Sequence, residues 1–348
     1  MNMKIDELTR SPNSDPSALL RYRDGIWAPE LLGAAVTELD FFSWLAKSPT
    51  DAKAICASLG LAERPVDVML TLFSAMGLVE RRGELFHLTE TAREFLVRDS
   101  PWFLGPYYSS LGGRPGCRDL LQVLRSGKPV GWTTRKDEKP WAEAMEQDAF
   151  ARQFSGAMDS RGLYLGPALA RRLDLKGRKH LLDIAGGSGI YSCCIVAAHP
   201  HVQATVFEKA PVDRVARDCI AKRGCSGRVD VEIGDMFAGP LPSGFDLHLW
   251  SNALHDWDAP TVGALLEKSF LALPPGGLVV VHDAHINPEK TGPISVAAYS
   301  VFLMVMTEGK CYSVGEMEGF LVGAGFANVV CEKTRADHSM VTARKPDR

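Results

Sequence analysis

The spacing of hydrophobic residues changes character about halfway along the 348-residue chain. In the first half, apolar positions recur every three or four residues, the period of helices with one buried face. From residue 180 onwards, short runs of consecutive apolar residues alternate with helical patterns, and such runs are typical of strands buried on both faces of a parallel sheet. The pattern predicts a mainly helical N-terminal part followed by a doubly wound α/β part.

The α/β part is predicted to contain one sheet of seven strands. We expect the strands at residues 181–184, 203–209, 228–237, 245–254, 278–286, 326–333 and 338–345. We expect helices between them at residues 190–198, 212–224, 259–273, 295–306 and 314–325. Because no helix separates the last two strands, they should form an antiparallel hairpin at one edge of an otherwise parallel sheet.

The N-terminal part has the pattern of a winged helix. Residues 16–46 indicate one or two buried helices, and helices at 50–61 and 64–78 precede a hairpin that turns at Gly83. We therefore predict a winged-helix domain at residues 1–100, a helical connector that contributes to a substrate pocket at 101–175, and a ligand-binding domain at 176–348.

Charge argues against the DNA-binding role of many winged helices. Residues 1–100 contain 11 Lys and Arg against 15 Asp and Glu, whereas a DNA-binding surface needs clustered cations. The helix at 64–78 carries one cation, Arg64, and the next cation in the chain is Arg81. One face of this helix is apolar. A ligand-responsive DNA-binding regulator stays an alternative, but we expect no nucleic-acid partner. The apolar face of this helix should instead be buried in the core or against a partner subunit.

The composition indicates a protein that acts on small molecules in the cytoplasm. The formal charge is −3, and no apolar run reaches the roughly 18 to 20 residues that span a bilayer, so we expect no membrane partner. The first ten residues contain acids where a signal peptide needs an apolar segment. The eight cysteines form no C-x-x-C pair, so we expect no metal site.

A glycine-rich turn follows the first strand of the α/β part. Asp183 stands at the carboxyl end of that strand, where open α/β sheets bind ligands, and Gly186, Gly187 and Gly189 follow it. The order lacks the G-x-G-x-x-G spacing of dinucleotide-binding oxidoreductases. It resembles motif I of S-adenosylmethionine (SAM) methyltransferases, which implies that the turn approaches the methionine half of SAM.

Later strand ends complete the predicted cofactor site. Glu208 follows the glycine turn by about 20 residues, the position at which doubly wound folds place an acid on the ribose hydroxyls. Asp235 could bind the adenosine, and the Met236 thioether could lie against adenine. The resemblance extends the cofactor site to Phe237 and Ser251.

The stretch SNALHDWD at residues 251–258 closely resembles the LHDWD segment of plant-type and bacterial small-molecule O-methyltransferases. This resemblance implies methyl transfer from SAM, with S-adenosylhomocysteine as product, to a phenolic hydroxyl of a small aromatic metabolite. It also implies that His255 is the general base and that the N-terminal domain forms a homodimer. A base is needed because a phenol with a pKa of about 10 is mostly protonated at neutral pH.

The residues that support the base depart from the family pattern. Asp283 aligns with an acid that orients the base, whereas Cys311 stands where the family has a glutamate. A neutral thiol cannot stabilise an imidazolium as a carboxylate does, so either this support is missing or the neighbouring Glu308 supplies it. A carbon or nitrogen acceptor, or an already acidic phenol, therefore stays open beside an ordinary hydroxyl. Asp256 is expected to be structural because side chains of consecutive residues diverge.

The methyl acceptor itself is not identified by the sequence. Phe154 and Met158, one helical turn apart, are expected to face a substrate ring, together with Met306 and Cys311. A catechol methyltransferase that uses Mg²⁺ is a rival interpretation, but it needs clustered acids that the sequence does not show.

Overall fold

The computed structural model describes residues 3–130 and 144–347, and the contacts within the chain define two compact units. The first unit comprises Met1–Ser17, Lys139–Ala284 and Val314–Arg348. The second comprises Ala18–Glu138 and His285–Ser313. The predicted domains, with boundaries at residues 100 and 175, run continuously along the chain, whereas each compact unit is assembled from separate segments.

The first unit is built on a seven-stranded sheet with the order β5-β4-β3-β6-β7-β9-β8. Neighbouring strands from β5 to β7 are parallel, and β9 is antiparallel to both β7 and β8. The bounds are β3 (His180–Ile184), β4 (Gln203–Glu208), β5 (Val229–Ile233), β6 (Leu247–Ser251), β7 (Leu278–Ala284), β8 (Ala327–Lys333) and β9 (His338–Arg344). The predicted mostly parallel sheet with a final antiparallel hairpin is confirmed.

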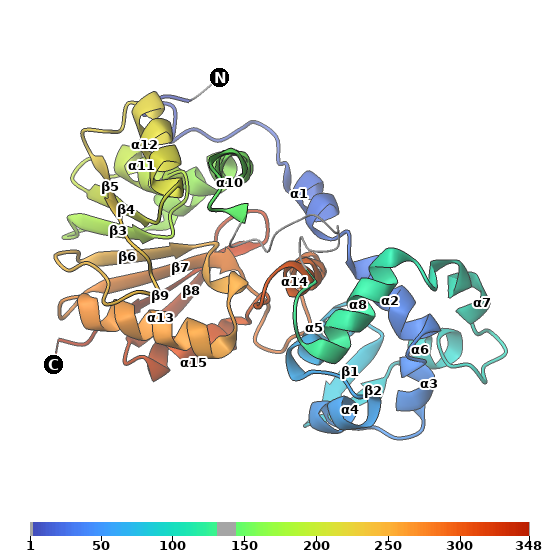
Figure 1. The fold of residues 1–348 in the computed structure, drawn as a ribbon. Helices are drawn as coiled ribbons and strands as arrows, with labels where there is room; N and C mark the ends of the chain where they lie inside the picture. Colours follow the sequence, from blue (N-terminus) through green and yellow to red (C-terminus); the bar gives the residue numbers. More distant parts are fainter. Residues whose placement is uncertain (1–2, 131–143, 348) are drawn as a thin grey trace. The chain divides into compact units, whose positions relative to one another are not determined.

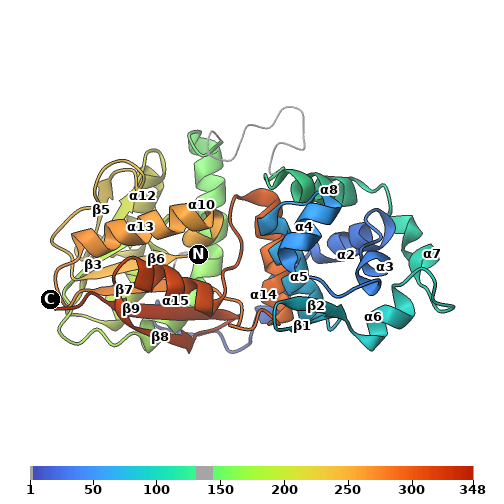
Figure 2. The ribbon, with the colours of Figure 1, turned by 90° about the horizontal axis from the view of Figure 1, so that it is seen from below.

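Helices cover both faces of this sheet (Figures 1 and 2). α10, α11 and α12 lie on one face, and α13 and α15 lie on the other. Their bounds are α10 (Asp148–Arg172), α11 (Ile190–Ala198), α12 (Val212–Arg223), α13 (Ala259–Ala272) and α15 (Val314–Gly323). The central strands β3, β6 and β7 are almost completely buried, which explains their continuous apolar sequences.

The second unit contains the predicted helix-turn-helix and wing. Its helices are α1 (Ser17–Asp24), α2 (Ala28–Thr37), α3 (Phe41–Ala46), α4 (Ala52–Leu59), α5 (Glu63–Ala75), α6 (Glu90–Phe95), α7 (Gly105–Tyr108), the 3₁₀ helix η1 (Ser109–Leu111), α8 (Pro115–Ser126) and α14 (Ile294–Met306). The wing consists of β1 (Val79–Arg82) and β2 (Leu85–Leu88). The first residue of α1, Ser17, is counted with the first unit. Asp51 caps α4 by accepting the Ala54 N–H, and Gly60 ends that helix in a left-handed conformation. The apolar face of α5 is buried, and the rings of Phe41, Phe42 and Phe73 pack together.

The helix predicted at residues 295–306 is present as α14, but it belongs to the second unit. There α14 contacts α5, α2 and α8. Arg64 of α5 donates hydrogen bonds to carbonyl oxygens of Met304, Thr307 and Gly309 at the end of α14. A cation at a helix C-terminus satisfies carbonyls that have no helical partner, so Arg64 anchors this segment beside the helix-turn-helix.

No helix among the described residues is long and apolar enough to cross a membrane.

Candidate functional site

The glycine turn of the first unit connects β3 to α11 in conformations that favour glycine. Gly187 has φ 58°, and a Cβ added there would meet no atom within 4 Å, so open space lies over its backbone. A Cβ on Gly186 would lie only 2.6 Å from the Asp183 carboxyl carbon. The turn therefore needs glycine at position 186 for space and at position 187 for backbone conformation.

Asp183 is completely buried at the end of β3, beneath this turn. Ser192 of α11 donates a hydrogen bond from its hydroxyl to Asp183 Oδ2 at 2.7 Å, and burial raises the pKa of Asp183 to about 7. The other carboxylate oxygen, Oδ1, is buried without a hydrogen-bond partner among the described residues. Since buried acceptors are nearly always satisfied, Asp183 Oδ1 indicates a place for a donor group of a ligand.

Glu208 is tied directly to the glycine turn. The Gly187 N–H donates to Glu208 Oε1 at 3.0 Å, and the Lys209 N–H donates to Oε2 at 3.1 Å. Burial raises the pKa of Glu208 to about 7. Each carboxylate oxygen has two lone pairs, so Glu208 keeps acceptor capacity for hydroxyl groups beside the turn.

Asp235, Met236 and Phe237 form the loop after β5, which ends at Ile233. Asp235 Oδ1 accepts the Phe237 N–H at 2.8 Å, and Lys268 Nζ of α13 donates to the carbonyl oxygens of Met236 and Phe237. The Phe237 ring is 45% exposed and contacts Trp257 edge to face, with centroids 4.7 Å apart. The structure thus fixes this loop at the carboxyl edge of the sheet with an aromatic ring exposed.

His255 lies in the short 3₁₀ helix η3 (Leu254–Asp256), which follows the carboxyl end of β6. Its Nδ1 lies 2.6 Å from Asp283 Oδ1 on the neighbouring strand β7, and both side chains are buried. Asp283 Oδ1 also accepts the Ala284 N–H at 2.8 Å, which holds the carboxylate in place. A neutral His255 that donates from Nδ1 carries its basic lone pair on Nε2, the arrangement that a general base requires.

Two carboxylates set the charge state of His255. Burial by itself lowers its pKa, but the negative charges of Asp283 and Asp256 outweigh burial, so the pKa of His255 is raised. Asp256 Oδ1 lies 3.6 Å from His255 Nε2. The expectation that Asp256 points away from its neighbour is therefore wrong, since its carboxylate lies close to the His255 ring.

The predicted substrate residues fall in both units. Phe154 and Met158 are half-buried one turn apart on α10, and Phe154 stacks on Phe150 beside a small apolar cluster that includes Val212. Met306 and Cys311 belong to the second unit, where the Cys311 N–H donates to Ser300 Oγ at 3.1 Å. Their roles at a substrate stay predictions.

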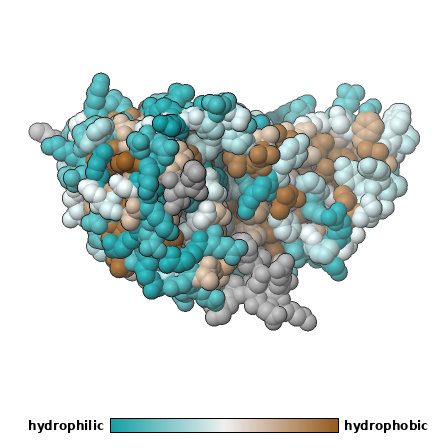
Figure 3. Space-filling model, turned by 90° about the horizontal axis from the view of Figure 1, so that it is seen from above, coloured by the Kyte–Doolittle hydropathy of each residue, from teal (hydrophilic) through white to brown (hydrophobic). Residues whose placement is uncertain are grey.

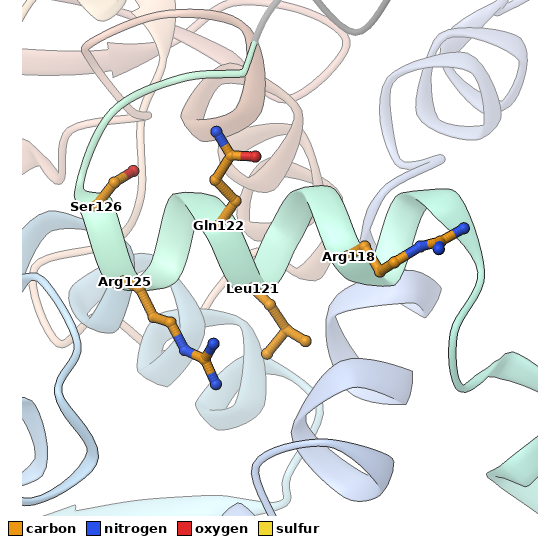
Figure 4. Close-up of a pocket in the computed structure, with 5 residues that line it drawn as sticks. All are labelled: Arg118, Leu121, Gln122, Arg125 and Ser126. Carbon is orange, nitrogen blue, oxygen red and sulfur yellow. The ribbon is translucent and has the colours of Figure 1, made fainter.

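A surface pocket on α8 contains none of the predicted site residues. It has a volume of about 490 Å³ and lies along one helix of the second unit (Figure 4). The lining residues are Arg118, Leu121, Gln122, Arg125 and Ser126. The chemistry-bearing residues instead gather at the carboxyl ends of β3, β4, β6 and β7, where the doubly wound fold is expected to bind ligands.

Several polar residues beside the site were not predicted from the sequence. Ser192 holds Asp183, while Tyr191, Asn252 and His338 are joined by hydrogen bonds next to Ser251. The position of Asn252, three residues before His255, was the available signal. His338 could not be found in this way because only the antiparallel insertion of β9 beside β7 brings it to the site.

Comparison with known proteins identifies the family. The profile of the O-methyltransferase domain matches residues 118–327. The 3-hydroxy-5-methyl-1-naphthoate 3-O-methyltransferase of Streptomyces sahachiroi is 32% identical over 90% of each chain. An O-methyltransferase family 2 protein from Planctomyces limnophilus, solved with apigenin, is 31% identical with a TM-score of 0.89, covering 99% of this chain and 100% of that one.

A further solved structure carries the cofactor. Human N-acetylserotonin methyltransferase in complex with SAM is 25% identical, with a TM-score of 0.60 over 97% of this chain and 100% of that one. The chain belongs to the O-methyltransferase family and is a SAM-dependent methyltransferase.

Proposed function

We propose that this enzyme transfers the SAM methyl group to a phenolic hydroxyl of a small aromatic substrate, with His255 as general base. The observation that carries the proposal is the 2.6 Å contact between His255 Nδ1 and Asp283 Oδ1 at the carboxyl edge of the sheet. This contact holds the imidazole in the tautomer whose Nε2 can accept the hydroxyl proton. Asp283 also stabilises the imidazolium that forms once the proton has moved.

The cofactor site fits SAM. When bound, SAM supplies an electrophilic methyl group on a sulfonium sulfur. The open backbone of Gly187, the buried acceptor Asp183 Oδ1 and the remaining acceptor capacity of Glu208 would hold its polar groups. Asp235, Met236 and the exposed Phe237 ring are proposed for the adenosine. Ser251, beside Asn252 at the end of β6, is proposed as a further contact.

The aromatic substrate is proposed on three grounds. A relative at 32% identity is named for a hydroxylated naphthoate, and a similar structure was solved with apigenin. Phe154 and Met158 of α10 offer an aromatic and a thioether face, both suited to stacking on a ring. Met306 and Cys311 stay predicted substrate contacts.

A carbon or nitrogen acceptor is the second candidate, and the presence of Cys311 favours it. By the resemblance of this region to the family pattern, Cys311 takes the place of a glutamate, so a carboxylate that would support the base is missing at that position. The rate of methyl transfer to an acceptor that needs no deprotonation would depend little on this missing carboxylate. Screening an aromatic metabolite library for SAM turnover, followed by mapping of the methylated atom, distinguishes the two candidates.

Replacing Asp283 should alter the pH dependence of turnover. A histidine base acts only when neutral, so kcat/KM rises with pH through the pKa of His255. Asp283→Asn removes a negative charge that raises this pKa, so the acidic limb should move to lower pH. The plateau should also fall by roughly tenfold or more, because the tautomer is no longer held. Asp230→Asn, an exposed position on β5, is the matched control, and an unshifted limb in Asp283→Asn would contradict the assignment.

We also propose that the second unit forms a homodimer. Large apolar side chains are exposed on and just after α1, with exposed fractions of 73% for Leu19, 84% for Tyr22 and 58% for Ile26. Hydrophobic residues are visible on this unit in Figure 3. Such clusters often mark interfaces between proteins. The homodimer is the assembly expected of the winged-helix unit.

Light scattering should report twice the mass of the chain, and Tyr22→Glu should shift the equilibrium to monomer. Tyr107→Glu, which changes a similarly exposed tyrosine of the same unit, should leave the dimer intact. A monomeric wild-type protein at working concentration would refute the proposal.

A further inference from the structure

A hydrogen-bond network centred on Asn252 surrounds the turn that leads to His255. The Asn252 side-chain N–H group donates to the Tyr191 hydroxyl at 3.0 Å and to Ser251 Oγ at 3.2 Å. Asn252 Oδ1 lies 2.9 Å from His338 Nε2, and the Asn252 backbone N–H donates to the His282 carbonyl at 2.9 Å. One residue therefore connects α11, β6, β7 and β9.

The partners of Asn252 are buried and are themselves anchored. Tyr191, Ser251, His282 and His338 are all at most 8% exposed. His338 Nδ1 lies 2.9 Å from the Ala336 carbonyl oxygen, and His282 bridges Ser251 and the hydroxyl of Thr334 at 3.0 and 3.1 Å. Buried hydrogen bonds rigidify the groups that they join, and Asn252 has such contacts with α11, β6 and β7 besides the close approach of His338.

The backbone of Asn252 makes the bend between β6 and η3. Its φ of 52° lies in the left-handed region, which asparagine tolerates better than most other residues. η3 begins two residues later and carries His255. Since the bend sets where η3 starts, a change at Asn252 would move the imidazole relative to Asp283.

We propose that Asn252 is a positioning residue that holds His255 in register with Asp283, with Tyr191 and His338 as its anchors. The inference rests on the proposed function of His255 as general base. It assigns a role to three residues outside the LHDWD segment and the glycine turn. Tyr191 is the second residue of α11, the helix that follows the glycine turn.

The test is Asn252→Gly, because glycine adopts the same left-handed backbone without strain while the amide group is lost. A misplacement of about 1 Å can cost about 10²-fold in rate, so we expect kcat to fall between about tenfold and 10²-fold. The affinity for SAM, measured by calorimetry, should change less than about threefold, which is under 1 kcal/mol. Tyr191→Phe removes one hydrogen bond and should give a smaller loss of the same kind.

The pH profile supplies a readout that general loss of stability would not give. The charged or titratable groups that act on His255 are Asp256 in η3, Asp283 on β7, Arg161 on α10 and His338 on β9. If the His255–Asp283 bond loosens in Asn252→Gly, the acidic limb of kcat/KM should move to lower pH, as in Asp283→Asn.

A wild-type kcat and pH profile in Asn252→Gly would overturn the inference, and so would an equal loss of SAM affinity and kcat. If that variant does not fold, Tyr191→Phe and His338→Gln decide in its place by the same criteria. His255→Ala separates this inference from the proposed function. When His255→Ala loses activity and Asn252→Gly does not, only the role of Asn252 fails; when neither loses activity, the general-base function fails.

Discussion

Replacing His255 by alanine should lower turnover of a hydroxyl substrate by about 10²-fold or more while SAM binding stays intact. Without Nε2 as proton acceptor, the reaction must wait for the small fraction of substrate that is already ionised at neutral pH. The loss should shrink as the assay pH approaches the pKa of the substrate hydroxyl, because solvent then supplies the anion. Turnover against pH, measured for wild type and variant with one substrate, checks this result.

The matched control is His180→Ala, which removes an exposed histidine at the start of β3 in the same unit. It should behave as wild type at every pH. A flat, near wild-type profile for His255→Ala would contradict the general-base role. Such a profile would support an acceptor that needs no deprotonation, with catalysis mainly by alignment of the reacting atoms.

Replacing Gly187 by valine should abolish SAM binding in the micromolar range. Gly187 has φ 58°, a conformation that costs a β-branched residue about 1–3 kcal/mol. The new side chain would also fill the open space over the turn and disturb the N–H group that donates to Glu208. We expect the affinity to fall by at least about 10²-fold, about 2.7 kcal/mol, in calorimetry.

Backbone strain alone can be separated from loss of the cofactor site. Gly177 has φ 77° and also has no atom within 4 Å of an added Cβ, but it lies in the turn before β3 rather than after it. Gly177→Val should therefore lower the melting temperature comparably and leave SAM affinity unchanged. Unchanged SAM binding in Gly187→Val would remove the glycine turn from the cofactor site.

The sheet could be predicted from the sequence because each strand has a recognisable pattern of apolar residues within its own few positions. The buried strands β3, β6 and β7 are continuous apolar runs, and the absence of a helical pattern between β8 and β9 indicated their hairpin. The same locality explains why Asp183, Glu208 and His255 could be proposed as site residues from the sequence, since each stands at or just beyond a strand end. Chain order does not show that α14 packs with α5, because this contact depends on residues far apart in sequence, such as Arg64 and Met304.

The remaining residues near the site could not be predicted, because their positions depend on side-chain orientation and on strand pairing between distant parts of the chain. Asp256 lies 3.6 Å from His255 in the short helix η3, an arrangement that the divergence of consecutive side chains does not predict. His338 reaches Asn252 only because β9 inserts between β7 and β8, an arrangement that alternation of strands and helices does not encode. Sequence motifs thus indicate candidate site residues, whereas the residues that contact and support them are identified only from the tertiary structure.

The most direct test is to incubate the wild-type enzyme with SAM and a panel of small hydroxylated aromatic compounds and to locate the transferred methyl group by mass spectrometry and NMR. We predict S-adenosylhomocysteine and an O-methylated product in equal amounts, with product formation at neutral pH slower by about 10²-fold or more in His255→Ala. A methyl group found on carbon or nitrogen, or O-methylation that persists at the wild-type rate in His255→Ala, would contradict it.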